Sequence, residues 1–292
     1  HGPANYNTAF ALGTALNVAF IIVEVFFGPL SDSIALLADA GHNLSDVLGL
    51  LLAWGAFWLS QTKPTARRTY GLRRSSILAA LANAIILLLA VGAIAWEAIQ
   101  RFAHPAPVAG LTVMLVAGIG ILVNGGTALL FMAGRKHDVN IEGAFLHMAA
   151  DAAVSLGVLV AGGIIAKSGW LWLDPTVSLV IVAAITIGTW DLLCKSLNLA
   201  MDAVPRGIDP AAVREYLASV PGVTEVHDLH IWGMSTTETA LTVHLIKPDA
   251  PASDSLLAHA AEELHRRFRI GHATIQVEHG DGHPCKLACD DM

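Results

Sequence analysis

The chain has 292 residues, of which 54% are hydrophobic and 14% charged, and its mean hydropathy is +0.59. Soluble domains carry about 25% charged residues, so this composition indicates a membrane protein and argues against an ordinary soluble domain. The net charge of −7 belongs to the last third: residues 1–200 hold ten Lys/Arg and ten Asp/Glu, whereas residues 201–292 hold seven and fourteen. This acidic part, which also has eight of the thirteen histidines, argues against nucleic acid as a partner.

Six stretches are long and apolar enough to cross a bilayer, which takes about 20 mostly apolar residues. We expect membrane-spanning helices at residues 8–29, 33–60, 76–102, 108–134, 141–167 and 173–199. Positive charge gathers in two connections, since residues 61–74 carry five Lys/Arg and residues 134–138 carry two. The positive-inside rule places both connections, and with them both chain termini, in the cytoplasm. The compact chain has no long His-rich insertion between the fourth and fifth spans, which favours a bacterial inner membrane.

The remaining chain has the pattern of a small α+β module. A helix is expected in "DPAAVREYLASV", since Asp-Pro is a helix-start signal, and another in the amphipathic "SDSLLAHAAEELHRRF". Alternating polarity predicts strands in "GVTEVHDLHIW", "TTETALTVHLI" and "HATIQVEH". The order αββαβ predicts a two-layer domain, so we divide the chain into a transport domain at 1–200 and a C-terminal domain at 201–292.

Cysteine content and the first residues add two expectations. Cys194, Cys285 and Cys289 offer no disulfide framework, which leaves metal ligation open for the last two. No basic segment precedes the first apolar run, so we expect no cleavable signal there. Because the sequence begins at His1 rather than Met, further residues are expected upstream.

Ionisable residues recur inside two of the expected spans. In "DAGHNLSD" His42 and Asp46 are four residues apart, and in "LHMAAD" His147 and Asp151 repeat that spacing. Residues four apart lie on one helix face, one turn from each other. An ionisable group inside a bilayer costs at least a few kcal/mol, so such residues indicate a functional site.

Face to face, the two pairs supply two imidazoles and two carboxylates, a set suited to tetrahedral Zn²⁺ at distances of about 2.0–2.2 Å. Zinc requires neutral imidazoles and ionised carboxylates, so its binding releases protons. A site that faces each side of the membrane in turn would then exchange Zn²⁺ for H⁺. The alternative is a set of helix–helix salt bridges or a proton relay without metal. Asp39 and Asn43 are expected to support the ligands, and Asp39 is also a candidate for ion entry.

Five segments together resemble the cation diffusion facilitator family, in its zinc-transporter subgroup, over nearly the whole chain. They are "SIALLADAGHNLSDVLGLLLA", "RTYGLRRSSILAALANA", "GAFLHMAADAAVSLGVLVAG", "DPTVSLVI" and "VHDLHIWGMSTTETALTVHL". The resemblance implies a homodimer, a transport site between the second and fifth spans of each protomer, and proton-coupled zinc efflux. It also implies a cytoplasmic ferredoxin-like domain similar to metallochaperones. Histidine in the first position of both pairs resembles zinc-preferring members.

The connection after the second span departs from the family pattern. Many relatives carry a metal-binding histidine there, whereas "TYGLRRSS" has Arg73 at that place. Residues 61–75 contain no His, Asp, Glu or Cys, so we predict no metal site in this connection. Its five cations are expected to face phospholipid head groups or a carboxylate.

The histidines of the C-terminal domain form a second candidate set. His227 and His244 lie in expected partner strands, where cross-strand neighbours can meet. The resemblance implies that His272 and Glu278 join them as ligands, in a site for one or two ions. It also implies a further site at a pair of C-terminal cysteines, here spaced as CxxxC. The alternative is that these histidines are surface residues, which is the preferred interpretation for His230, His259 and His265.

Two other functions were weighed against a transporter. An intramembrane zinc enzyme is disfavoured because there is no HExxH motif and a four-ligand site leaves no position for a catalytic water. A membrane metal sensor that signals through its tail would not require ligands at mid-bilayer. No Walker motif is present, which argues against a nucleotide-driven pump. The prediction is therefore a transporter with Zn²⁺ as cargo and protons as counter-ion, and not an enzyme.

Overall fold

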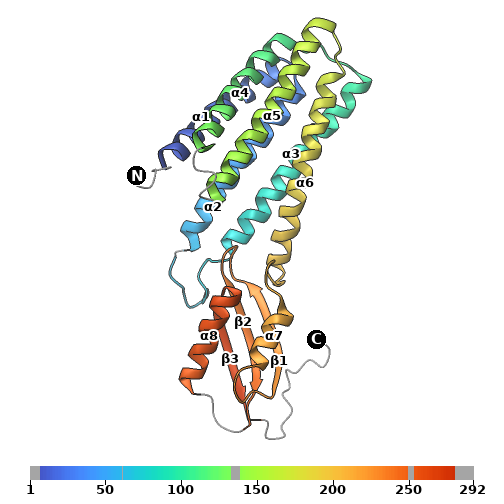
Figure 1. Cartoon of the computed structure of the whole chain (residues 1–292). Coiled ribbons are helices and arrows are strands. Elements are labelled where there is room, and N and C mark those ends of the chain that lie inside the picture. The colour runs from blue at the N-terminus through green and yellow to red at the C-terminus, as the bar shows by residue number, and fades with distance from the viewer. Residues whose placement is uncertain (1–6, 61, 133–138, 249–252, 280–292) are drawn as a thin grey trace. The chain divides into compact units, whose positions relative to one another are not determined.

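A computed structural model describes residues 7–60, 62–132, 139–248 and 253–279. Six long helices come first, and each begins and ends close to its predicted boundary. They are α1 (Asn7–Leu30), α2 (Ile34–Ser60), α3 (Ser75–Ala103), α4 (Gly110–Met132), α5 (Val139–Ser168) and α6 (Leu173–Ala200) (Figure 1). All six have the length and apolar composition needed to cross a membrane, which confirms the expected spans.

The contacts divide the chain into two compact units. The first contains His1–Leu51 and Ala82–Asp191, and the second contains Leu52–Leu81 and Leu192–Met292. The helices α2, α3 and α6 therefore contribute residues to both units. The domain boundary after residue 200 stays a prediction, although α6 does end at Ala200.

The beginning of α2 is held by a carboxylate from α6. The backbone N–H groups of Ile34 and Ala35 donate to the Asp174 carboxylate at 2.8 and 3.3 Å, and the Ser33 hydroxyl donates to the same group. The first N–H groups of a helix have no partner inside the helix, and a carboxylate satisfies them and matches the positive end of the helix dipole. Asp174 is buried, so the start of α2 is fixed to α6 within the first unit.

Helices α4 and α5 pack closely through glycine. A Cβ atom added to Gly110 would lie 2.6 Å from the Gly162 carbonyl oxygen and 2.7 Å from the Ala166 nitrogen. Both neighbours are backbone atoms, which cannot rotate away as a flexible side chain could, so only glycine permits the two helices to approach this closely. Helix α1 packs on α4 in turn, and Phe20 lies in the buried core beside Val116.

Gly110→Ala should therefore destabilise the membrane unit by about 1–3 kcal/mol, the usual effect of overpacking. Gly118→Ala is the matched control on the same helix, because its new Cβ would lie 3.7 Å from Leu159 Cδ1, an ordinary contact. Thermal unfolding in detergent, followed by tryptophan fluorescence, measures the difference. Equal midpoints for the two variants would contradict the assigned contact between α4 and α5.

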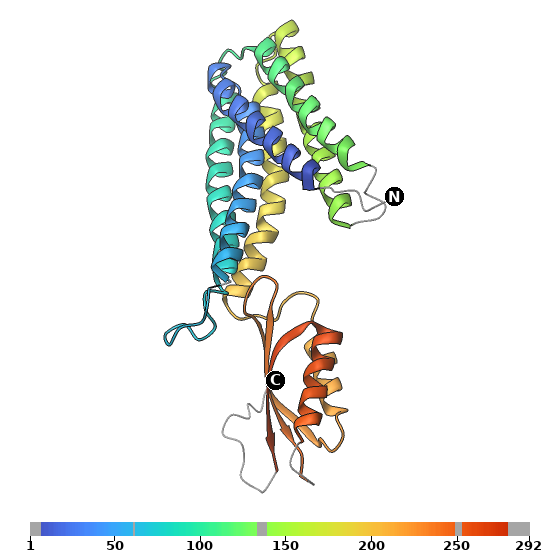
Figure 2. The ribbon, with the colours of Figure 1, turned by 90° about the vertical axis from the view of Figure 1, so that its left-hand side faces the viewer.

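The C-terminal domain has the predicted order αββαβ. Its elements are α7 (Pro210–Ala218), β1 (Glu225–Gly233), β2 (Thr239–Ile246), α8 (Asp254–Phe268) and β3 (Ile270–Glu278). The central strand β2 pairs antiparallel with β1 and parallel with β3. Both helices cover one face of this sheet (Figure 2), and Leu217, Leu241 and Leu264 fill the core beneath them.

Local signals explain where the two short helices begin. Asp209 accepts a hydrogen bond from the Ala211 N–H, and Pro210 follows as the first helical residue of α7. Ser253 caps α8 in the same way, with its hydroxyl accepting from the Leu256 N–H. These are ordinary start signals, which is why the sequence predicted both helices.

Candidate metal centres

The two His–Asp pairs of α2 and α5 face each other inside the first unit. His42 Nε2 lies 3.3 Å from Asp151 Oδ1, and His147 Nε2 lies 3.2 Å from Asp46 Oδ2, so each imidazole contacts the carboxylate of the other helix. Within each helix the corresponding distances are 3.9 Å for His42–Asp46 and 3.7 Å for His147–Asp151. The structure thus brings all four predicted ligands together, and we call them the membrane quartet.

The spacing of the membrane quartet suits a small tetrahedral ion. Ligands about 2.1 Å from a central ion lie about 3.4 Å from one another at the corners of a tetrahedron. The four imidazole–carboxylate distances, two between the pairs and two within them, run from 3.2 to 3.9 Å and fall on either side of that value. Oδ2 of Asp46 and Oδ2 of Asp151 are buried and accept no hydrogen bond from the residues that the structure describes. Buried carboxylate oxygens without donors are expected where a cation is to bind.

The membrane quartet borders a cavity of about 240 Å³. Asp46, His147 and Asp151 line it together with Asn17 and Met148. The side chains of Asp46 and His147 are 37% and 42% exposed, whereas that of Asp151 is 3% exposed. An ion entering through the cavity would therefore meet the first two ligands before it reaches the third.

The two predicted supporting residues lie behind the ligands and are both buried. Asp39 Oδ2 accepts a hydrogen bond from the Ser155 hydroxyl at 3.3 Å, across from α2 to α5. Asn43 donates from Nδ2 to Glu24 Oε2 at 3.0 Å, across from α2 to α1. Among the hydrogen bonds of the described residues, neither side chain bonds a quartet ligand directly, so their support would act through the helices that carry them.

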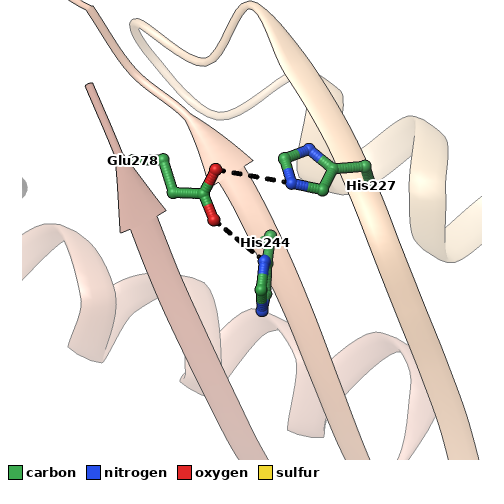
Figure 3. Close-up of side chains that lie close together, drawn as sticks. All are labelled: His227, His244 and Glu278. Atoms are coloured by element: carbon green, nitrogen blue, oxygen red, sulfur yellow. Dashed lines mark ion pairs between the residues drawn. The ribbon is translucent and has the colours of Figure 1, made fainter. Parts of the chain in front are cut away.

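A second cluster lies on the sheet of the C-terminal domain. Register pairs His227 of β1 directly with His244 of β2, as expected for hairpin partners. Glu278 of β3 lies between them, with its carboxylate oxygens 3.5 Å from His227 Nε2 and 2.9 Å from His244 Nδ1 (Figure 3). Ligand atoms of these three residues lie within 4.8 Å of one another, so they could hold one ion. Both ring nitrogens of His227 are buried and make no hydrogen bond within the described structure.

Asp228 is a member of this neighbourhood that the sequence did not predict. Its Oδ2 lies 3.5 Å from His244 Nε2, and its Oδ1 lies 2.8 Å from His230 Nε2. The pairing of β1 with β2 shifts between His227 and His230, and Asp228 has a φ of 48° there. This positive φ is uncommon for a residue with a side chain, although Asp tolerates it better than most. The only sequence signal was a carboxylate in the middle of a strand pattern.

His272 is the predicted ligand that the structure does not bring to the cluster. It stands opposite Ala240 near the start of β3, whereas Glu278 stands opposite Ile246 at the end of that strand. Its ring contacts Tyr70 instead, with centroids 5.6 Å apart. Within one chain the structure thus brings three of the four predicted residues together, because His272 and Glu278 lie at opposite ends of one strand. Cys285 and Cys289 lie outside the described residues.

The basic connection before α3 contacts carboxylates of its own unit. Arg73 Nη1 lies 3.1 Å from Glu238 Oε1, and Arg74 forms an ion pair with Asp202. Next to them the Thr236 N–H donates to the Ser76 hydroxyl at 3.1 Å. Of the two environments expected for these cations, a carboxylate is the one found at both arginines.

Comparisons with known proteins cover both domains. The model of the cation efflux transmembrane domain matches residues 11–199, and that of the cation efflux protein cytoplasmic domain matches residues 205–280. The metal cation efflux system protein CzcD of Cupriavidus metallidurans is 32% identical over 287 residues, which cover 98% of this chain and 90% of that protein. The zinc transporter ZitB of Escherichia coli is 36% identical over 272 residues, covering 92% and 86%.

Two further matches have informative names. The cadmium, cobalt and zinc/H(+)-K(+) antiporter of Bacillus subtilis is 34% identical over 264 residues, which cover 89% of this chain and 85% of that protein. Among solved structures, the metal-bound C-terminal domain of the CzcD transporter from Cupriavidus metallidurans is 36% identical. It covers 24% of this chain and 99% of its own, with a TM-score of 0.23.

Proposed function

This chain belongs to the cation diffusion facilitator family of membrane metal transporters, and from that membership we propose that it is a Zn²⁺/H⁺ antiporter. It is an integral membrane protein and a transporter rather than an enzyme. The direction we propose is export of zinc from the cytoplasm, across a bacterial inner membrane and with both termini in the cytoplasm. The family model of the C-terminal domain further supports a homodimer.

The observation that carries this proposal is the membrane quartet. Two imidazoles and two carboxylates meet from α2 and α5 at distances suited to tetrahedral coordination. Imidazole ligands favour borderline metals such as zinc over Ca²⁺ and Mg²⁺, which prefer oxygen ligands alone. Relatives named as zinc transporters, and one named as a cadmium, cobalt and zinc antiporter, fit the same class of cargo.

Proton exchange follows from the chemistry of these ligands. A Zn²⁺ ion bound by all four would need the neutral imidazoles of His42 and His147 and the ionised carboxylates of Asp46 and Asp151. When zinc leaves, protons can return to the imidazoles, because histidine titrates near neutral pH. If the site faces the cytoplasm and the outside in turn, each cycle moves zinc one way and protons the other.

The C-terminal cluster supports a second role, in which the cytoplasmic domain binds Zn²⁺ and reports its concentration to the transporter. His227, His244 and Glu278 would be the ligands, since their donor atoms lie close enough for one ion. Two buried ring nitrogens of His227 without hydrogen bonds are the observation that favours this site. Cys285 and Cys289 stay a proposal for a further site.

Transport can be tested with the purified protein in liposomes that contain a zinc-sensitive dye. An imposed pH difference should drive Zn²⁺ against its own gradient, and a proton ionophore should stop that movement. Zinc flux that persists unchanged after the pH difference is collapsed would contradict proton coupling. A protein that shows no zinc flux under any pH difference would contradict the antiporter itself.

A further inference from the structure

A second pair of acidic residues lies in the membrane unit, apart from the quartet. Glu24 of α1 and Asp39 of α2 are both 0% exposed. Asp39 and Asn43 are four residues apart on one face of α2, and Asn43 donates to Glu24 at 3.0 Å, so both carboxyl groups lie beside the same face of α2. Helices α1, α2 and α4 contain no lysine or arginine that could neutralise two buried negative charges.

The hydrogen bonds around this pair leave room for one proton. Asn43 donates to Oε2 of Glu24, and Ser155 donates to Oδ2 of Asp39. The other oxygen of each group, Oε1 of Glu24 and Oδ1 of Asp39, is buried and accepts no hydrogen bond from the described residues. Two adjacent buried carboxyl groups cannot both ionise, because the repulsion and the lost hydration are too unfavourable. One proton held between the two free oxygens satisfies both and leaves the pair with a single negative charge.

We propose that Glu24 and Asp39 together form a proton-binding site that empties when Zn²⁺ binds to the membrane quartet. The inference rests on the proposed antiport function and adds a second source of protons to the quartet's own ligands. The step is a simple dissociation: the O–H bond of the shared carboxylic acid breaks, the electron pair stays on the carboxylate, and the proton passes to water.

The positions of these residues explain how zinc binding at the quartet would affect the protonation of Glu24 and Asp39. Asp39 lies three residues before His42, which places them about one turn apart on α2. Ser155, which donates to Asp39, lies four residues after Asp151 on α5. The ionisable groups that act on the pair from these helices are His42 and Asp151, and both are quartet ligands. When Zn²⁺ displaces only one imidazole proton, the quartet gains one positive charge, and this charge favours a second negative charge on the pair, because opposite charges attract strongly in a low-dielectric interior.

A route for the released proton is also present. Asn43 lines the cavity of about 240 Å³ beside the quartet, and its amide contacts Glu24. One side chain therefore separates the acidic pair from the space that an entering ion would use. A proton leaving the pair and a Zn²⁺ ion entering the quartet would share this cavity.

The test counts protons released per Zn²⁺ bound, using the full-length protein in weakly buffered detergent solution at neutral pH. The Glu24→Gln and Asp39→Asn variants should each release about one proton fewer than the wild type, since only one carboxyl group is left in each variant and no proton can be shared. Glu97→Gln is the matched control, because this carboxylate on α3 is exposed and paired with Arg101, and its proton count should not change. The C-terminal cluster contributes equally to every variant, so the difference isolates the acidic pair.

Infrared difference spectra of the wild type provide a measurement that needs no variant to fold. Zinc addition should remove the carbonyl band of a protonated carboxylic acid, and this loss should be absent from whichever of the two variants binds zinc. Wild-type proton counts in both variants, or no protonated carboxyl band in the zinc-free protein, would overturn the proposal. Because these experiments measure binding, a protein that binds zinc without transporting it would refute the antiporter and leave the proton site standing.

Discussion

Replacing Asp151 by asparagine should abolish zinc transport while leaving the fold intact. Asp151 contacts both imidazoles of the membrane quartet, at 3.3 Å from His42 and 3.7 Å from His147. The substitution keeps the size of the side chain but removes a negative charge and a strong oxygen ligand. Even partners outside the first coordination sphere affect metal affinity by about 10–100-fold, so we expect the loss of a ligand to weaken binding by more than about 100-fold. Dye-reported zinc uptake into liposomes measures the effect.

Asp32→Asn is the matched control for this experiment. This substitution makes the same chemical change at a side chain that is 61% exposed. The backbone φ of Asp32 is 51°, a conformation that asparagine tolerates well. Asp46→Ala and His147→Ala should lose transport as Asp151→Asn does, because they remove the ligands that line the cavity. Near-normal zinc flux in these variants would refute the site and favour the alternative that the four residues form only helix–helix salt bridges.

His244→Ala should remove one bound Zn²⁺ per chain from the C-terminal domain. His244 lies 2.9 Å from Glu278 at the centre of the cluster and pairs directly with His227. Without its imidazole only two of the three donors remain, so we expect zinc affinity to fall by at least about tenfold. Equilibrium dialysis of the full-length protein measures the number of ions bound. A second readout is the stabilisation of the folded protein by zinc. Binding at one site raises the free energy of unfolding by about 2.7 kcal/mol when the free zinc concentration is 100 times the Kd.

His272→Ala is the control for the C-terminal site, because this histidine lies near the other end of β3 and contacts Tyr70. It should bind as much zinc as the wild type, with the same thermal stabilisation. A loss of zinc equal to that of His244→Ala would show that His272 belongs to the site and would contradict the three-residue cluster. Glu278→Gln should resemble His244→Ala, since it removes the carboxylate charge that contacts both imidazoles.

The sequence predicted the elements whose physical causes are local. Long apolar runs placed the six helices, and the spacing of four between His42 and Asp46 placed both on one face of α2. The same spacing in α5 made it reasonable that the two pairs would face each other, since isolated charges in a bilayer need partners. The sequence also placed His227 and His244 in neighbouring strands, although their direct pairing depends on the shift of register between His227 and His230.

Features that depend on contacts between distant segments could not be read in this way. The separation of His272 from Glu278 needed only strand geometry, since six residues of one strand span about 20 Å. What the local pattern does not show is the register of β3 against β2, which places Glu278 rather than His272 near the end of β2 that carries His244. The shift of pairing at Asp228 is a property of two strands together rather than of one. The partner of Arg73 lies more than a hundred residues away in the sequence, and only the structure identifies it as Glu238.

The contact between Asp174 and the start of α2 has a mechanical consequence for the whole membrane unit. The hydrogen bonds to Asp174 hold the start of α2 against α6, while the close approach at Gly110 packs α5 against α4. Each of these contacts joins one ligand-bearing helix to a different neighbour, α2 to α6 and α5 to α4. A movement of α2 with α6 relative to α5 with α4 would change the distances between the two His–Asp pairs but not those within a pair, which each helix maintains. In the transport cycle proposed above, such a movement would change the coordination of the ion without any helix having to unfold.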